Sequence, residues 1–116
     1  MTGFSKHTRE LVFLRSGGRC ERCGRPPASW RAAFQWHHRR PRGMGGSKAA
    51  DTNTAANCAL LCGYCHAYVE THRERGFEAG WLVRQGEKPT ETPLNLNGQW
   101  VLLDNYGYIT PVEESA

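Results

Sequence analysis

The stretch LCGYCH, residues 61–66, carries two cysteines separated by two residues, with a histidine directly after the second. A second pair with the same spacing stands earlier in the chain, in CERC at residues 20–23. A two-residue spacer lets both thiolates of a tight turn face one ion, and two such turns supply the four sulfur ligands of a tetrahedral zinc site. We therefore expect a structural zinc ion that holds the fold together, bound by Cys20, Cys23, Cys62 and Cys65.

The fifth cysteine, Cys58, is left without a partner in this scheme. An odd number of cysteines suits a metal site better than a framework of disulfides. A free cysteine away from a metal usually behaves as a small apolar side chain. We therefore expect Cys58 to be buried in the core.

The segment between the two cysteine pairs is rich in positive charge. Between Glu21 and Asp51 it contains no acidic residue, and its basic residues are Arg22, Arg25, Arg31, Arg39, Arg40, Arg42 and Lys48. Residues 1–86 carry 14 Lys/Arg against 6 Asp/Glu, whereas residues 87–116 carry one Lys against five acids. A long segment of one sign indicates a polyanion as partner, although an ordinary solvated face is the alternative.

The composition indicates one small domain with a thin apolar core. Hydrophobic residues make up 39% of the 116, so a structural metal would add needed stability. The chain contains no apolar run of the roughly 20 residues that a membrane span needs. The first ten residues, MTGFSKHTRE, lack the apolar stretch of a secretory signal, so we expect a reducing, cytoplasmic environment.

The local patterns predict a small α+β fold. Residues 5–18 read as a helix capped by Ser5 or Thr8, with an apolar stripe of Leu11, Val12 and Leu14, and stopped by the glycines at 17 and 18. Residues 32–38 read as a strand, 41–57 as a long loop, 58–61 as a buried strand, and 65–70 as the start of a helix.

The second half of the chain changes from helix to strand. Thr71 and Glu74 have capping-box spacing, which predicts a second short helix ending at Gly80. After Trp81 the pattern becomes β, with an Asn97-Gly98 turn between apolar runs that is typical of a hairpin. Residues 105–112 can add a further strand.

The order of the polar motifs resembles the HNH endonuclease family. Two histidines stand at 37–38 in HHRRPRGMGG, Asn57 follows, and LCGYCH is followed by Glu70. Such a series is most similar to small HNH proteins of actinobacterial phages, and the similarity covers roughly residues 5–83. It implies a ββα-metal fold, to which the local patterns add the four-cysteine zinc knuckles, an N-terminal helix and a C-terminal β segment over about 84–112. We expect residues 1–116 to form one such domain, located in the host cytoplasm if a phage encodes it.

The resemblance also implies roles for the motif residues. His37 would bind a catalytic divalent ion and His38 would be the general base, which is possible because adjacent residues on a strand point to opposite sides. Asn57 would hold the strand or loop that carries His38, and His66 would be a second ligand of the ion. The alternatives are a purely structural His37 and an Asn57 that merely forms a turn.

The third ligand departs from the common family pattern, in which a histidine stands four residues after the second ligand. Here that position is Glu70, which shares a helix face with His66. We favour Glu70 over its rival His72, because His72 would lie about 120° around the helix from His66. Two histidines and a carboxylate leave open positions on an ion, as catalysis requires.

The implied activity is hydrolysis of DNA phosphodiesters with Mg²⁺, Mn²⁺, Ni²⁺ or Zn²⁺ as the catalytic ion. The residues expected to contact the DNA backbone are Arg39, Arg40, Arg42 and Lys48. Two rival interpretations remain, a zinc-knuckle DNA-binding module without catalysis and a phage packaging protein that acts beside the terminase.

Overall fold

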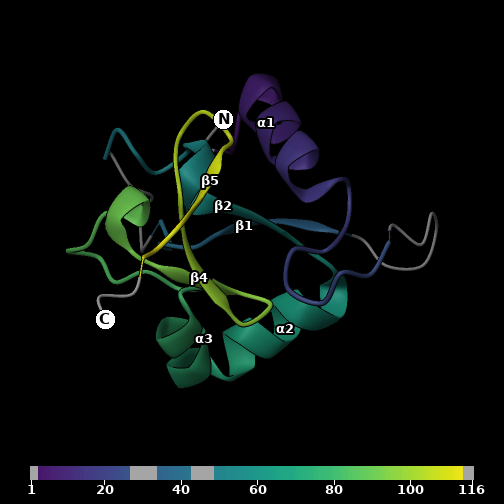
Figure 1. The fold of residues 1–116 in the computed structure, drawn as a ribbon, viewed down its shortest axis with the longest axis vertical. Helices are drawn as coiled ribbons and strands as arrows, with labels where there is room; N and C mark the ends of the chain where they lie inside the picture. Colours follow the sequence, from purple (N-terminus) through teal and green to yellow (C-terminus); the bar gives the residue numbers. More distant parts are fainter. Residues whose placement is uncertain (1–2, 27–33, 43–48, 114–116) are drawn as a thin grey trace.

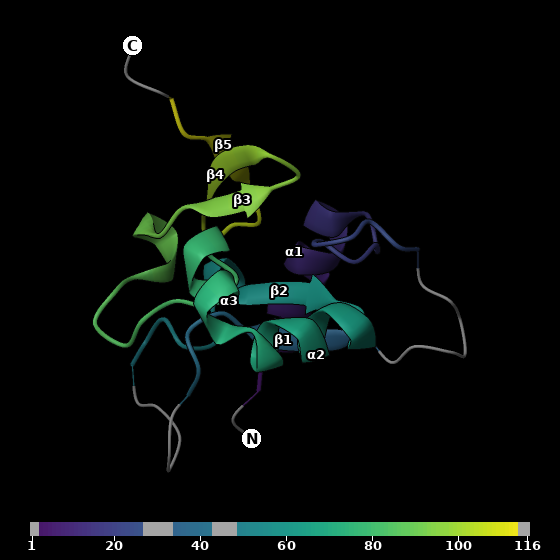
Figure 2. The ribbon, with the colours of Figure 1, turned by 90° about the horizontal axis from the view of Figure 1, so that it is seen from below.

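The computed structural model describes residues 3–26, 34–42 and 49–113. Two antiparallel strands cross the middle of the molecule, with one helix on one side and two helices on the other (Figure 1). A second, three-stranded sheet stands beside this centre and lies at the top of Figure 2. The protein is therefore a small α+β structure, as the sequence predicts.

The N-terminal helix, α1, spans Lys6–Ser16. Of the two expected caps, Ser5 is the one used, because its hydroxyl oxygen accepts a hydrogen bond from the backbone N–H of Thr8. Gly17 ends the helix with a φ of 68°, a left-handed conformation that favours glycine. Leu14 does not belong to the expected apolar stripe, since its side chain is 78% exposed. Val12 is buried. Leu14 stands two residues later on the helix, so its side chain points about 200° away from that of Val12.

The central pair consists of β1 at Gln35–His38 and β2 at Cys58–Leu61, which is preceded by a short 3-10 turn, η1, at Ala55–Asn57. The strands are antiparallel, with His37 opposite Ala59 and His38 opposite Cys58. All four residues of β2 are buried, as expected for this segment. Their side chains alternate between a larger core towards α2 and a smaller core beneath α1. The two histidines of β1 therefore point to opposite faces as well.

Helices α2 and α3 follow β2 and complete the ββα order, spanning Gly63–Thr71 and Arg73–Ala79. The predicted second short helix is present and ends at Gly80, but the predicted capping box is wrong. Thr71 still belongs to α2, where its hydroxyl donates to the carbonyl oxygen of Ala67, and His72 stands at the start of α3 without a side-chain cap. A side chain at Gly80 would meet the carbonyl oxygen of Pro93 at 2.1 Å, so this position requires glycine.

The C-terminal segment forms the second sheet, after a 3-10 turn, η2, at Pro89–Glu91. Its strands are β3 at Leu94–Leu96, β4 at Gln99–Leu103 and β5 at Ile109–Pro111, all antiparallel in the order β3-β4-β5. The predicted Asn97-Gly98 hairpin is confirmed, with positive φ at both residues. No helix in the described part of the chain is long and apolar enough to cross a membrane.

Candidate metal and nucleic-acid site

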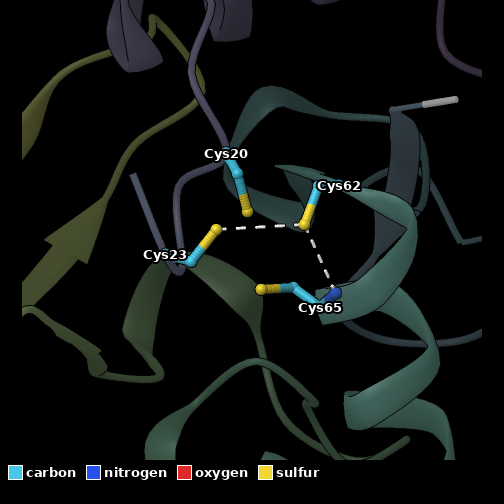
Figure 3. A group of neighbouring side chains, drawn as sticks. All are labelled: Cys20, Cys23, Cys62 and Cys65. Carbon is cyan, nitrogen blue, oxygen red and sulfur yellow. Dashed lines mark hydrogen bonds between the residues drawn. The ribbon is translucent and has the colours of Figure 1, made fainter. Parts of the chain in front are cut away.

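The four cysteines of the two C-x-x-C pairs come together at one point. Their sulfur atoms point toward one another, and all lie within 4.8 Å of each other (Figure 3). The first pair sits in a tight turn in which Gly24 donates its backbone N–H to the carbonyl oxygen of Cys20. The second pair forms the start of α2, where Cys62 is the N-cap and its sulfur accepts from the N–H of Cys65. The expected knuckle geometry is thus present.

The surroundings shift the pKa values of the cluster's thiols in different directions. Burial raises the pKa of Cys65 to about 12 and that of Cys23 above its ordinary value, whereas the pKa of Cys20 is lowered. Burial alone raises the pKa of Cys20, but hydrogen bonds from the backbone N–H groups of Cys62, Cys23 and Arg22 bring it down to about 7. The guanidinium of Arg22 also lies 3.2 Å from the sulfur of Cys65. Four soft sulfur donors in a mostly buried cluster fit a structural zinc ion.

Cys58 lies outside this cluster, as the sequence predicts. It is fully buried in the smaller core with Phe4, Val12 and Leu60. Burial raises the pKa of its thiol to about 12, so it stays protonated at neutral pH.

A second cluster of potential metal ligands is formed by His37, His66 and Glu70, whose ligand atoms all lie within 4.8 Å of one another. His37 comes from β1, while His66 and Glu70 are one turn apart on α2. The Nδ1 atom of His37 is 3.9 Å from Oε2 of Glu70, and the two imidazole centroids are 5.4 Å apart. A mixed nitrogen and oxygen donor set of this kind suits a divalent ion with open positions.

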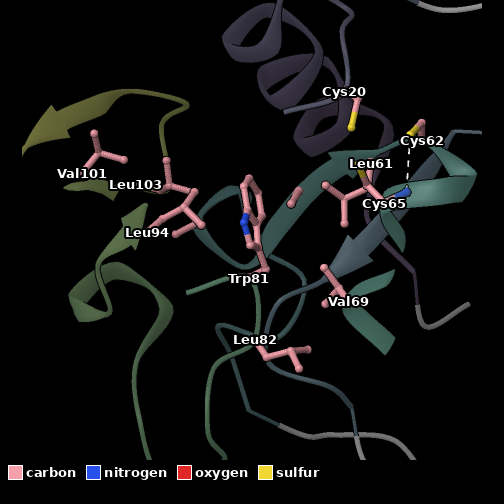
Figure 4. Packing of buried hydrophobic residues seen from close by; sticks show 12 residues of the cluster. Cys20, Leu61, Cys62, Cys65, Val69, Trp81, Leu82, Leu94, Val101 and Leu103 are labelled. Atoms are coloured by element: carbon pink, nitrogen blue, oxygen red, sulfur yellow. Dashed lines mark hydrogen bonds between the residues drawn. The ribbon is translucent and has the colours of Figure 1, made fainter. Parts of the chain in front are cut away.

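The buried His37 is held in one orientation by the core. Its Nε2–H donates to the carbonyl oxygen of Trp81 at 2.8 Å, which leaves the lone pair on Nδ1 facing Glu70. The indole of Trp81 packs in the larger core near Leu61, Leu94 and Leu103 (Figure 4). Burial, the largest influence, lowers the pKa of His37 to about 4, so the ring is neutral and able to bind a metal.

His38 points to the other face of β1 and is held by different residues. Its ring stacks on Phe4 with centroids 4.1 Å apart, and its Nε2–H donates to Oδ1 of Asn53 at 2.8 Å. The Nδ1 atom therefore carries the lone pair. Burial lowers the pKa of His38 below its ordinary value, which keeps the ring neutral at neutral pH. His37 and His38 nevertheless line one cleft, together with His66, Glu70, Arg42 and Arg73.

Asn57 is fully buried and does not touch the ring of His38 in the contacts that the structure describes. Its Oδ1 accepts from the backbone N–H of Arg40, and its Nδ2 donates to the carbonyl oxygens of Arg40 and Thr52. It therefore holds the chain just after His38, while Asn53 orients the ring itself. Nothing in the sequence singled out Asn53, because it lies in a loop without any periodicity.

Residues 20–70 match the HNH endonuclease family model. This HNH region begins at the first knuckle cysteine, ends at Glu70 and includes all three residues of the second cluster. The match is thus a similarity of this region to a family of endonucleases. No curated protein and no solved structure matches the chain.

At the end of the HNH region, the geometry separates the two rival ligands. Glu70 belongs to the cluster with His37 and His66, whereas His72 stacks on Tyr68 with centroids 4.2 Å apart. His72 stands between α2 and α3, and its Nδ1 atom is 3.1 Å from the carbonyl oxygen of Tyr68 in α2. The helix break places His72 outside the cluster.

The expected DNA contact of Arg39 needs correction, because this side chain is fully buried inside the HNH region. Its guanidinium donates to four backbone carbonyl oxygens, those of Ala56, Gly80, Pro89 and Thr92. These carbonyls come from segments far apart in the sequence. Arg39 is therefore a structural residue that ties the HNH region to the following loop, and it cannot reach a phosphate.

The other expected DNA contacts differ in their exposure. Arg40 is only 6% exposed and bonds Asp51 and the carbonyl oxygen of Glu87, so it too has a mainly structural position. Arg42 lines the cleft of the two clustered histidines, as does Arg73, which pairs with Glu70 at 2.9 Å. Lys48 lies outside the described residues. The cationic wall of the cleft is thus made by Arg42 and by Arg73, and no pattern in the sequence points to Arg73.

Proposed function

We propose that the protein is a metal-dependent endonuclease that hydrolyses DNA phosphodiester bonds in the cleft of the HNH region. The observation that carries the proposal is the cluster of His37, His66 and Glu70, which opens onto the same cleft as His38. The HNH match over residues 20–70 supports the same chemistry. The detailed likeness to actinobacterial phage proteins stays a prediction.

Two kinds of metal have separate places in this proposal. The four cysteines hold a structural zinc ion, and His37, His66 and Glu70 hold a catalytic divalent cation such as Mg²⁺, Mn²⁺, Ni²⁺ or Zn²⁺. When bound, the catalytic ion supplies stabilisation of negative charge on the phosphate oxygens. The core supports the site of this ion because the bond from Nε2 of His37 to the carbonyl oxygen of Trp81 leaves Nδ1 of the neutral ring free of hydrogen.

His38 acts as the general base in the proposed reaction. Its Nδ1 lone pair takes a proton from the attacking water, whose oxygen then bonds to phosphorus as the P–O3′ bond breaks. The leaving 3′-oxygen gains a proton from solvent, which yields 3′-hydroxyl and 5′-phosphate ends. Asn53 is a positioning residue because it sets the tautomer and orientation of the ring. Asn57 positions the following backbone.

Arg42 and Arg73 provide positive charge along the cleft, where a DNA backbone would pass. Arg73 also orients Glu70 through their ion pair. The contribution of these side chains is attraction and placement of the phosphate rather than proton transfer.

The rival functions are a DNA-binding module without catalysis and a packaging protein that acts beside a terminase. Both account for the zinc knuckles and the basic residues. Neither requires a second ligand cluster next to an oriented neutral histidine, so these features favour the enzyme.

The decisive experiment is cleavage of supercoiled plasmid by the full chain with each of Mg²⁺, Mn²⁺, Ni²⁺ and Zn²⁺. We expect metal-dependent cleavage that His38→Ala lowers by about 10²–10⁴-fold while metal binding, followed by calorimetry, is retained. His37→Ala should instead weaken metal binding, and excess metal should partly restore cleavage. His7→Ala, at an exposed position on α1, is the matched control. Metal-independent or absent cleavage by the wild type would reject the proposal.

A further inference from the structure

A groove outside the catalytic cleft runs along the outer face of α1. It is a wide, open groove with a volume of about 490 Å³, and its lining residues are Lys6, Arg9, Glu10, Phe13, Leu14 and Trp36. The volume lies in the range of small-ligand sites, roughly 300–1,000 Å³. Phe13 is 52% exposed, although its ring packs over Gly18. Two cations flank this aromatic surface. Packing within the fold does not explain why the surface is exposed.

Trp36 connects this groove to the catalytic cleft. It lines the groove on one side and the cleft of His37 and His38 on the other. Trp36 and His38 stand two residues apart on β1, so their side chains lie on the same face of the strand. The rise between the two positions is about 7 Å. In the described part of the chain β1 pairs only with β2, so its other edge pairs with no described strand. A strand lying along this edge would pass from the cleft directly into the groove.

We infer that the groove binds an unpaired nucleotide next to the phosphate in the cleft, so that the preferred substrate is single-stranded or locally unpaired DNA. This inference rests on the proposed nuclease function and specifies its substrate class. The rings of Phe13 and Trp36 offer apolar faces for a base, and base stacking on aromatic side chains depends little on base identity. Lys6 and Arg9 provide positive charge for the flanking phosphates. In an intact duplex the bases are stacked inside and cannot enter such a groove.

Charge and continuity favour this occupant over a protein partner. The rim has two cations against the single carboxylate of Glu10 among the residues that line the groove. The groove also continues from a cleft whose wall is built from Arg42 and Arg73. An apolar protein segment could pack on Phe13 and Leu14, but its binding would not require that the groove continue into the cleft of His37, His66 and Glu70.

The first test measures equilibrium binding by fluorescence anisotropy, with no added divalent ion so that cleavage does not interfere. The probes are a labelled single-stranded oligonucleotide and the duplex of the same sequence. We expect Phe13→Ala to bind the single strand roughly tenfold more weakly and the duplex less than about twofold more weakly. Tyr106→Ala is the control, because Tyr106 is an aromatic residue outside the groove that is also exposed, at 76% against 52% for Phe13. Unchanged single-strand binding by Phe13→Ala, or equal losses for both probes, would overturn the inference.

The second test uses two neighbouring charges of opposite sign on α1. Arg9→Gln should weaken single-strand binding and flatten its dependence on salt, while Glu10→Gln should strengthen binding. Both variants change exposed side chains, so folding should be retained. Shifts in the same direction for the two variants would contradict a polyanion in the groove.

The third test separates this inference from the proposed function. Oligonucleotides with 2-aminopurine at successive positions should show quenched fluorescence at one base in the wild type, and Phe13→Ala should remove the quenching. This signal requires no catalysis. If the wild type cleaves plasmid but no position responds to Phe13→Ala, the groove assignment falls and the nuclease proposal stands. If the response is present without any cleavage, the groove binds a nucleotide and the nuclease proposal falls.

Discussion

The imidazole of His37 donates a hydrogen bond from Nε2 to the carbonyl oxygen of Trp81, 44 residues further along the chain, at 2.8 Å. A carbonyl oxygen can only accept, so this bond settles which ring nitrogen carries the hydrogen. The lone pair on Nδ1 then faces Glu70, and the indole of Trp81 anchors the arrangement in the core. The carbonyl oxygen of Trp81, held in place by the core, thus determines which nitrogen of His37 can bind a metal ion.

Glu70, and not His72, should be the third ligand of the catalytic ion. Glu70→Gln removes the negative charge of the cluster, so we expect affinity for Mn²⁺ to fall by more than about tenfold. His72→Ala should leave the affinity unchanged, since its ring bonds and stacks within the turn at Tyr68. Isothermal titration calorimetry measures both. Arg73→Gln controls for loss of the Arg73–Glu70 ion pair. A larger loss in His72→Ala than in Glu70→Gln would reject the assignment.

The two asparagines near His38 should fail in different ways when changed to alanine. Asn53→Ala releases the imidazole of His38, so we expect slower cleavage with little change in stability or metal affinity. Asn57→Ala leaves the backbone N–H of Arg40 and two carbonyl oxygens without their partner in the interior, which costs about 3 kcal/mol of stability. Urea unfolding and plasmid cleavage distinguish the two effects. Stable Asn57→Ala together with an unfolded Asn53→Ala would contradict these roles.

Two cysteine-to-serine variants test the zinc site, since both cysteines are fully buried and only one is in the cluster. Cys62→Ser should lose zinc and fold poorly, because binding of a structural zinc contributes directly to folding. Cys58→Ser should keep one zinc per chain and a cooperative unfolding transition. Metal analysis by mass spectrometry and circular dichroism provide the readouts. Equal zinc content in the two variants would be incompatible with the site.

The raised pKa of Cys58 predicts its reactivity. Only the thiolate reacts with iodoacetamide, and a thiol whose pKa is about 12 is ionised to about one part in 10⁴ at pH 8. In the folded protein, labelling of Cys58 should therefore be negligible and should increase as the pH rises towards that pKa. Peptide mapping measures the label, and the urea-unfolded chain is the positive control. Rapid labelling of Cys58 in the folded protein at pH 8 would show that burial is incomplete.

Replacing Arg39 should lower the stability of the fold, whereas replacing Arg42 should weaken DNA binding. Arg39→Gln removes hydrogen bonds to four backbone carbonyl oxygens, most of them buried, so we expect a loss of about 3 kcal/mol or more in unfolding free energy. Arg42→Gln should remain folded and reduce the slope of log K against log salt by about one, as expected for one lost phosphate contact. A stable Arg39→Gln with a reduced salt slope would restore Arg39 as a DNA contact.

Local patterns in the sequence determined a large part of this structure. The C-x-x-C spacing was sufficient to predict the four-cysteine cluster, because a two-residue spacer limits how the two sulfurs can point. The Asn97-Gly98 pair predicted its hairpin, because positive φ at both positions favours these residues. The spacing of His66 and Glu70 predicted their common helix face, and the adjacency of His37 and His38 predicted opposite directions on a strand.

The tertiary structure alone decided the roles of residues whose partners are distant in the chain. By sequence Arg39 and Arg42 are equivalent members of one basic run, yet one is buried among four carbonyls and the other lines the cleft. Asn53 and the carbonyl of Trp81 orient the two histidines from loops without any periodic pattern. Spacing along the chain determines which neighbours share a face, but which side chain is enclosed depends on how the elements pack together.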